Sequence, residues 1–341
     1  MGKNKKFESK PNYDLYDILE VSPRARPEVI DAAYITLMKQ YHPDKGGDNR
    51  IAVSLNNARE ILLDHKKRKA YDESNENLEG KIVGNYRIIE QIAEGGFGKT
   101  YLGEHIHFGS MVCIKHENQI SPQDEEILID EAKAMWDLRH YGIPAIRDLL
   151  KLDDGSLALV MSYIPGPTLE QAVKKVGGLE SEDVAWITER SLNVLRYLHY
   201  NGVVHGDVKP QNIIIQPESH NIVLVDYGLS AIKPTSSDGC KGYTPYFASP
   251  EQENGETILP ESDFYSLGLT MIYALGGDAQ QRKVPGDVPD EFCHFIKKLI
   301  ARDILLRPNW EKEDLCAKLQ DLRMKVFGRR HSDMKAIRGL A

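Results

Sequence analysis

Cysteine is scarce in this sequence, and the cysteines are not arranged for cross-linking or metal binding. There are four among 341 residues, Cys113, Cys240, Cys293 and Cys316, and they lie far apart without the paired spacing of a metal site. That pattern is typical of free thiols in a reducing compartment. We therefore expect a cytoplasmic protein.

Long apolar segments are also missing. The longest uncharged run, Phe264 to Gly277, is too short to cross a bilayer and predicts a helix buried inside protein. No apolar stretch follows the basic residues at the N-terminus, and Lys6 stands where a myristoylation signal needs Ser or Thr. No membrane association is expected.

The chain has no excess of basic residues. Residues 1–75 contain 14 Lys and Arg against 12 Asp and Glu, whereas residues 76–341 contain 29 against 39, so the net charges are +2 and −10. Because binding to a nucleic-acid backbone requires a basic face, nucleic acid is not an expected partner. An apolar content of 41% predicts a folded protein, and the length allows two domains.

The first 75 residues predict a helical domain. A short helix is expected around residues 13–19, and a third helix begins near Ile51. Between them, apolar residues recur at helical spacing and form one stripe: Ile30, Ala33, Tyr34, Leu37, Met38 and Tyr41. The second and third helices can pack as an antiparallel hairpin.

The tripeptide His42-Pro43-Asp44 lies in the turn of this hairpin. Alone it carries little information, because Pro and Asp are ordinary turn residues. Together with segments 13–19, 34–44, 55–58 and 67–72, it resembles a J-domain over about 60 residues. The resemblance implies binding to a seventy-kilodalton heat-shock chaperone, whose ATP hydrolysis His42, Pro43 and Asp44 would stimulate.

The second helix departs from the J-domain pattern. Ile35 and Thr36 occupy places that are commonly basic in the family, and few basic residues remain nearby: Lys39, Lys45, Arg24 and Arg26. Because opposite charges raise the encounter rate and fix orientation, chaperone affinity is expected to be reduced or its specificity altered. The alternative is a helical hairpin used only for protein contacts.

A second domain is expected after a short linker at residues 75–84. Three strands are predicted first, at 86–92, 100–105 and 111–115. A helix at 121–138 follows and opens with a Ser-Pro capping sequence. Two more strands are predicted at 149–152 and 157–162. Beyond Glu170 the pattern is mostly helical.

A glycine-rich turn separates the first two of these strands. Glycine has no side chain, so backbone N–H groups there can approach phosphate oxygens closely. Lys115 follows on the next strand, and Glu131 lies sixteen residues later on the helix, so a Lys–Glu pair can hold the lysine against the α- and β-phosphates. Taken singly, Lys115 is typical of a surface lysine and Glu131 of a solvated helix charge.

Three further motifs stand in a fixed order: His205-Gly206-Asp207-Val208-Lys209-Pro210-Gln211-Asn212, then Asp226-Tyr227-Gly228, then Ala248-Ser249-Pro250-Glu251. With the glycine-rich turn, this order resembles the protein-kinase family from residue 86 to about 327. The resemblance implies an α+β, bilobal protein-kinase fold with a β-rich N-lobe and an α-helical C-lobe, preceded by the small all-α J-domain. The expected boundaries are a tail at 1–11, the J-domain at 12–74, the linker at 75–84, the kinase domain at 85–328 and a tail at 329–341.

The kinase resemblance also implies residue roles. Asp207 would accept or orient the proton of the substrate hydroxyl, and Lys209 would reach the γ-phosphate of ATP. Asn212 and Asp226 would hold Mg²⁺. ATP would contact a longer set: Ile92, Ala93, Glu94, Gly95, Gly96, Phe97, Gly98, Thr100, Lys115, Glu131, the gatekeeper Met161, the hinge residues Ser162, Tyr163 and Ile164, and Ile214 beneath the base. For the apolar residues Met161, Ile164 and Ile214, core packing is the alternative.

Other residues resemble specificity and support elements of the family. Lys209 with Thr244 marks serine/threonine specificity, and Glu251 with Arg307 resembles a buried ion pair. Asp263 resembles the carboxylate that supports the catalytic loop from a helix beneath it.

Three positions depart from the family pattern. Ala93 and Tyr227 replace a glycine and a phenylalanine, which are mild changes. Gly206 replaces the arginine that usually pairs with a phosphorylated activation segment, so switching through such a pair is not favoured.

The leading hypothesis is an Mg·ATP-dependent protein serine/threonine kinase whose J-domain recruits the chaperone, so that tethering concentrates the kinase near chaperone-associated protein substrates. A second hypothesis is a J-domain co-chaperone with a nucleotide-binding pseudokinase scaffold that transfers no phosphate. A third, a kinase-fold enzyme acting on a small molecule, is disfavoured by Thr244 and Pro250-Glu251, which resemble peptide-docking parts.

Overall fold

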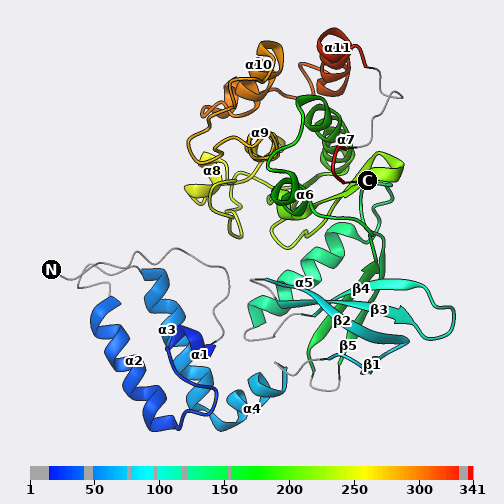
Figure 1. The fold of residues 1–341 in the computed structure, drawn as a ribbon. Helices are drawn as coiled ribbons and strands as arrows, with labels where there is room; N and C mark the ends of the chain where they lie inside the picture. The colour runs from blue at the N-terminus through cyan, green and yellow to red at the C-terminus, as the bar shows by residue number, and fades with distance from the viewer. Residues whose placement is uncertain are drawn as a thin grey trace. The chain divides into compact units, whose positions relative to one another are not determined.

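A computed structural model describes residues 15–41, 49–74, 78–95, 98–116, 122–152, 155–329 and 337–340. The chain divides into two compact units: the first comprises Met1–Leu128 with Asp148–Val160, and the second comprises Ile129–Arg147 with Met161–Ala341. Figure 1 traces the elements of each unit along the chain. Within the described ranges, no helix has both the length and the apolarity needed to cross a membrane.

The first unit begins with four helices. They are α1 (Leu15–Ile18), α2 (Pro27–Tyr41), α3 (Asn49–Leu63) and α4 (His65–Ser74). Helices α2 and α3 lie side by side, as expected for the predicted hairpin (Figure 1). The apolar stripe supplies part of a small core: Leu15, Tyr16, Leu19, Ile30, Leu37, Leu55, Ala58, Ile61, Leu62 and Tyr71. The predicted motif His42-Pro43-Asp44 lies outside the described residues.

Helix α4 was not predicted as a separate helix, because it is strongly polar. Arg68 ties it to the loop before α2, where its Nη2 donates to the carbonyl oxygens of Pro23 (3.0 Å) and Ala25 (2.8 Å). The Tyr71 hydroxyl accepts a hydrogen bond from the backbone N–H of Leu15 at 2.9 Å. Polar contacts, rather than an apolar face alone, therefore attach α4 to the other three helices.

A sheet follows, with strand order β1-β2-β3-β4-β6-β5. Its elements are β1 (Ile82–Val83), β2 (Tyr86–Gly95), β3 (Gly98–His105), β4 (Met111–His116), β5 (Ile146–Lys151) and β6 (Leu157–Ser162), with α5 (Pro122–Met135) between β4 and β5. Alternate residues of β3 and β4 are buried, as expected for strands with one face on a core. Leu78, inside the predicted linker, is buried in that core, and β1 also falls within the linker range.

The second unit is mostly helical. Its helices are α6 (Leu169–Val176), α7 (Ser181–Tyr200), α8 (Pro250–Glu253), α9 (Pro260–Ala274), α10 (Asp290–Leu299) and α11 (Leu315–Phe327), with short 3₁₀ turns η2 (Pro210–Asn212), η3 (Pro217–Ser219) and η4 (Ile304–Leu306). A short hairpin is formed by β8 (Ile213–Gln216) with β9 (Asn221–Leu224), and a separate two-stranded antiparallel sheet is formed by β7 (Val203–Val204) with β10 (Ala231–Ile232). Helix α9 is buried along most of its length, which confirms the buried helix predicted from the uncharged run at 264–277.

Candidate active site

The β8–β9 hairpin brings two predicted metal ligands to the same end of a small sheet. Asn212 ends η2 immediately before β8, and Asp226 follows β9 by two residues. Ile213 pairs with Leu224, and the backbone N–H of Val225 donates to the carbonyl oxygen of Asn212 at 2.9 Å. The register of the hairpin thus places Asn212 and Asp226 next to one another.

Asp207 lies in the loop between β7 and β8 and is only 7% exposed. Its Oδ1 accepts a hydrogen bond from the Thr244 hydroxyl at 2.7 Å, and its Oδ2 lies 2.7 Å from Lys209 Nζ. The Asn212 amide donates to the same Oδ2 at 3.0 Å. Every one of these partners is a donor, so the pocket suits an ionised carboxylate and fixes its direction.

Lys209 and Thr244 are themselves joined. The lysine Nζ donates to Thr244 Oγ1 at 2.8 Å, while the threonine donates its own proton to Asp207. Asp207, Lys209 and Thr244, from two separate segments, therefore each contact the other two.

A buried carboxylate on α9 holds the backbone of this loop. Asp263 Oδ2 accepts from the backbone N–H of His205, and Oδ1 accepts from that of Gly206, both at 2.8 Å. Asp263 is 1% exposed. Because buried N–H groups require partners, this carboxylate fixes the chain direction just before Asp207.

Glu131 on α5 and Tyr227 belong to the second unit and are in contact. The backbone N–H of Tyr227 donates to Glu131 Oε1 at 3.0 Å, and Glu131 is 1% exposed. Burial, with the nearby charges of Asp263 and Glu131, raises the pKa of the Tyr227 phenol well above its usual value, so this side chain stays a neutral donor to Leu224 O. Glu131 is therefore a buried, bonded carboxylate rather than a solvated helix charge.

The predicted hinge bonds to the backbone of Ala145, and the segment that follows it packs on strand β8. Ser162 exchanges hydrogen bonds with the backbone of Ala145, and Met161 is 7% exposed. Beyond the partly buried Tyr163 and Ile164, Gly166 adopts φ +130, and a Cβ there would lie 2.1 Å from Ile215 O. Only glycine fits so close to a neighbouring backbone. Thr168 forms a β-bridge with Ile214, so the segment just after the hinge is held to Ile214.

The remaining predicted nucleotide contacts lie on the first unit. Ile92, Ala93, Glu94 and Gly95 end β2, and Gly98 and Thr100 begin β3, with Gly95 opposite Gly98 in the hairpin register. Thr100 in turn pairs with Lys115 on β4. Gly96 and Phe97 lie outside the described residues.

Glu251 and Arg307 form a bidentate buried ion pair. The distances are 2.6 Å from Nη1 to Oε1 and 2.9 Å from Nη2 to Oε2. Although burial raises the pKa of Glu251, hydrogen bonds from Arg307 and Ser262 outweigh it and hold that pKa below its usual value. The pair fixes α8 to the segment that follows η4.

Gly206, just before Asp207, has no room for a side chain. It adopts φ +75, and a Cβ would lie 2.6 Å from Leu229 O. Its carbonyl accepts from Gln252 Nε2 at 2.7 Å. An arginine at this position would require the backbone to shift.

Sequence reasoning missed four residues that make long-range contacts in the second unit: His199, Gln252, Trp310 and Lys241. Lys241 lies 3.0 Å from Asp130 on α5, and the other three bond to the loop or its support. Their partners are 46 to 111 residues away in the chain, so no local pattern could have revealed them.

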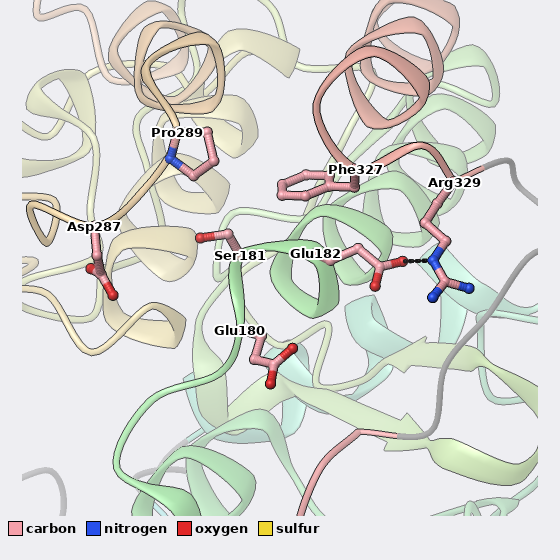
Figure 2. A pocket seen from close by; sticks show the side chains of 7 residues that line it. All are labelled: Glu180, Ser181, Glu182, Asp287, Pro289, Phe327 and Arg329. Atoms are coloured by element: carbon pink, nitrogen blue, oxygen red, sulfur yellow. Dashed lines mark ion pairs between the residues drawn. The ribbon is translucent and has the colours of Figure 1, made fainter.

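A cavity of about 340 Å³ lies elsewhere in the second unit (Figure 2). Its lining comes from the start of α7, the end of α11 and the segment before α10: Glu180, Ser181, Glu182, Asp287, Pro289, Phe327 and Arg329. Glu182 faces Arg329 at 3.7 Å. None of the predicted catalytic or nucleotide-binding residues lines this cavity.

The Asn212 and Asp226 side chains suit a hard cation. The amide nitrogen of Asn212 faces Asp207, which directs its oxygen elsewhere, and Asp226 adds a carboxylate. Oxygen ligands of this kind match Mg²⁺, which usually takes only one or two protein ligands beside phosphate oxygens. Among the described residues, no group of three or more His, Cys, Asp or Glu could hold a metal alone.

Comparisons with known proteins match both parts of the chain. A model of the protein kinase domain matches residues 86–284, and one of the DnaJ domain matches residues 14–72. Serine/threonine-protein kinase C of Synechocystis is 34% identical over 222 residues, covering 59% of this chain and 41% of the relative.

Two further relatives are of the same class. Serine/threonine-protein kinase PrkC of Bacillus subtilis is 33% identical over 228 residues, covering 65% of this chain and 34% of the relative's length. Serine/threonine-protein kinase pkn3 of Myxococcus xanthus is 29% identical over 212 residues, covering 58% and 39%. The chain thus spans about two fifths or less of the length of these relatives.

Proposed function

The chain belongs to the protein kinase family and carries a DnaJ domain at residues 14–72, and on this premise we propose that it is an ATP-dependent protein serine/threonine kinase that phosphorylates chaperone-associated proteins. The serine/threonine class of its kinase relatives supports the first part. The DnaJ match supports a chaperone partner. Both resemblances expected from the sequence are confirmed by these family matches.

One observation carries the enzymatic proposal: Asp207 is buried, surrounded by donors and joined to Lys209 and Thr244. A carboxylate held in this way can orient a substrate hydroxyl and accept its proton as phosphate is transferred. Lys209, beside it, can place its positive charge near the γ-phosphate. A scaffold without catalysis would not need these three groups to be fixed together.

The other residues have supporting roles in the proposal. Mg²⁺·ATP, when bound, supplies the phosphoryl group and neutralises charge that develops on it. Asn212 and Asp226 would hold the metal, and Lys115 with Glu131 would orient the phosphates. The hinge Ser162–Ile164, Met161 and Ile214 would enclose the base.

The J-domain would deliver the kinase to its targets. A short linker raises the local concentration of a chaperone-bound client without any new contact at the active site. His42, Pro43 and Asp44 are the proposed chaperone contacts. The protein substrate itself would then be selected mainly by which client the chaperone holds.

The enzymatic proposal is tested with the full chain, Mg²⁺, radiolabelled ATP and a panel of serine and threonine peptides. Asp207→Asn and Asp226→Asn should each lower phosphate transfer by about 10²- to 10⁴-fold. Asp321→Asn, an exposed carboxylate on α11, is the matched control and should change nothing. A wild-type chain that labels nothing, or an Asp226→Asn variant as active as wild type, would overturn the proposal in favour of a nucleotide-binding scaffold.

The recruitment proposal needs a separate test. His42→Gln should reduce phosphorylation of a client presented on a seventy-kilodalton chaperone, while leaving the rate on a free peptide unchanged. Equal loss on both substrates would indicate damage to the kinase domain and would refute recruitment.

A further inference from the structure

A four-residue segment after η4 contacts three elements that surround the catalytic loop. Arg307 pairs with Glu251 on α8. Asn309 Nδ2 donates to Glu261 Oε1, in the first turn of α9, at 2.7 Å. Trp310 Nε1 donates to Nδ1 of His199, near the end of α7, at 2.8 Å. The first contact resembles an element of the family, whereas the last is not part of any motif in the sequence.

The Trp310 contact determines which nitrogen of His199 carries the proton. An indole N–H can only donate, so His199 Nδ1 must accept and cannot bear a hydrogen. The hydrogen of the neutral ring is therefore on Nε2, which lies 2.8 Å from Asp263 Oδ2. The side chains of His199 and Asp263 are 2% and 1% exposed, so water does not offer alternative partners.

Asp263 connects His199 to the catalytic loop. Its two oxygens already accept from the backbone N–H groups of His205 and Gly206, and the His199 donor is a third. Phe264 keeps both rings in place, because it makes edge contacts with His199 at 5.6 Å and with Trp310 at 5.0 Å between ring centroids. A continuous path of donors and acceptors thus runs from Trp310 to the residue before Asp207.

We propose that Trp310 is a positioning residue for catalysis: its indole N–H fixes the Nε2–H form of His199, which locks the Asp263 carboxylate on the backbone of the catalytic loop. The proposal rests on the proposed role of Asp207. In the Nδ1–H tautomer of His199, the ring N–H and the Trp310 N–H would face each other as two donors. At the other side of the ring, Nε2 and Asp263 Oδ2 would face each other as two acceptors. Asp263 would then lose one of its three donors, and the loop would lose its fixed direction.

The first test needs no variant. Nitrogen-15 NMR of the full chain labelled at histidine distinguishes the two neutral tautomers and the protonated ring. The His199 signal, assigned by its loss in His199→Gln, should be that of the Nε2–H tautomer. An Nδ1–H signal would overturn the proposal directly.

The second test removes only the indole donor. Trp310→Phe keeps an aromatic ring but should change the tautomer or protonation of His199 and lower kcat by roughly 10-fold, because small misplacements of catalytic groups are costly. KM for ATP and for peptide should change little. Trp186→Phe is the matched control, since it also removes an indole donor of the second unit, one that bonds Asp183 at 3.3 Å. Equal kcat loss in both variants would refute a specific role for Trp310.

A double variant separates positioning from packing. In His199→Gln, an amide nitrogen can donate to Asp263 whatever residue occupies position 310. Adding Trp310→Phe to this background should therefore lower kcat much less than it does in the wild type. Additive losses would contradict the proposal. An inactive wild-type chain would refute the proposed function, whereas an active wild type with an unaffected Trp310→Phe variant would refute this inference alone.

Discussion

The four N-terminal helices (residues 15–74) and the second unit differ in whether they bury charged side chains. Among the described residues between 15 and 74, every buried side chain is apolar or tyrosine, and no charged side chain is buried; the Arg59–Asp31 pair, for example, is exposed. The second unit instead buries a set of charged residues: Glu131, Glu182, Asp183, Glu189, Asp207, Glu251, Asp263, Arg307 and Arg323. The core of the first region is apolar, with polar contacts such as those of Arg68 at its edge, whereas the second unit contains charged groups in its interior.

This difference indicates where the chain requires exact placement of functional groups. Burying a charge costs free energy unless it is fully paired, so buried ion pairs are poor general stabilisers. They do, however, hold backbone segments in one arrangement. Asp263 on α9 holds the backbone just before Asp207, and the Glu251–Arg307 pair holds α8 against the segment after η4, so both buried carboxylates position backbone segments.

The largest expected effect comes from breaking a buried pair. Arg307→Ala would leave Glu251 buried without its cation and should destabilise the second unit by about 4 kcal/mol. Hydrogen exchange of α8 and α9 peptides, read by mass spectrometry, measures this loss. Stability within 1 kcal/mol of wild type would mean that the pair contributes little to the fold, and the contrast between the regions would fail.

A core truncation should be nearly as costly in the first region. Leu55 is 2% exposed, and Leu55→Ala should destabilise the four helices by about 3 kcal/mol through lost burial and a cavity. Exchange of α2 and α3 amides should increase, while that of α7 and α9 stays constant. Val53→Ala, at a 58% exposed site on the same helix, serves as the control.

The third prediction concerns pH and His205. Burial lowers the pKa of this fully buried histidine, despite opposing effects of Asp263, Asp207 and Asp226. As pH falls below about 6.5, the unfolded chain takes up this proton before the folded chain, so stability decreases through that window and is unaffected above it. The unfolding midpoint should fall more between pH 7.5 and 5.5 in the wild type than in His205→Phe. Parallel pH profiles would contradict this.

The smallest effect is expected at the surface of the first region. Arg59 and Asp31 are 43% and 39% exposed, and Arg59 also lies 4.8 Å from the Tyr34 ring. Arg59→Ala should cost below about 1 kcal/mol, because solvent screens such pairs. A loss as large as that of Arg307→Ala would show that exposed and buried pairs are equivalent here.

Much of this architecture could be read from sequence. Strand β6 has the predicted bounds, α5 begins at Pro122, within the predicted Ser-Pro capping sequence, and the ordered motifs alone indicate the kinase family. Local pattern suffices for such elements, since their spacing and turn residues are short-range properties. Helix α4 was missed because its apolar content is low and its anchors, Arg68 and Tyr71, bond to segments 43 to 56 residues away.

The contacts that support the loop of Asp207 were likewise only partly predictable. Asp263 could be proposed from a resemblance, but His199 and Trp310 could not, because they lie 64 and 111 residues from the atoms they bond. Likewise, the sequence indicated that Gly206 lacks an arginine, whereas the approach of Leu229 O explains why no side chain is tolerated. Long-range contacts of this kind require the fold.

The spacing between Arg307 and Trp310 has a consequence for insertions. Two residues separate an arginine anchored on α8 from an indole anchored on α7, and Asn309 between them is bonded to α9. One added residue in this stretch would displace the indole by about 3.3 Å, more than a hydrogen bond can absorb. An insertion between Arg307 and Trp310 should therefore not be tolerated, because it would break at least one of these three contacts.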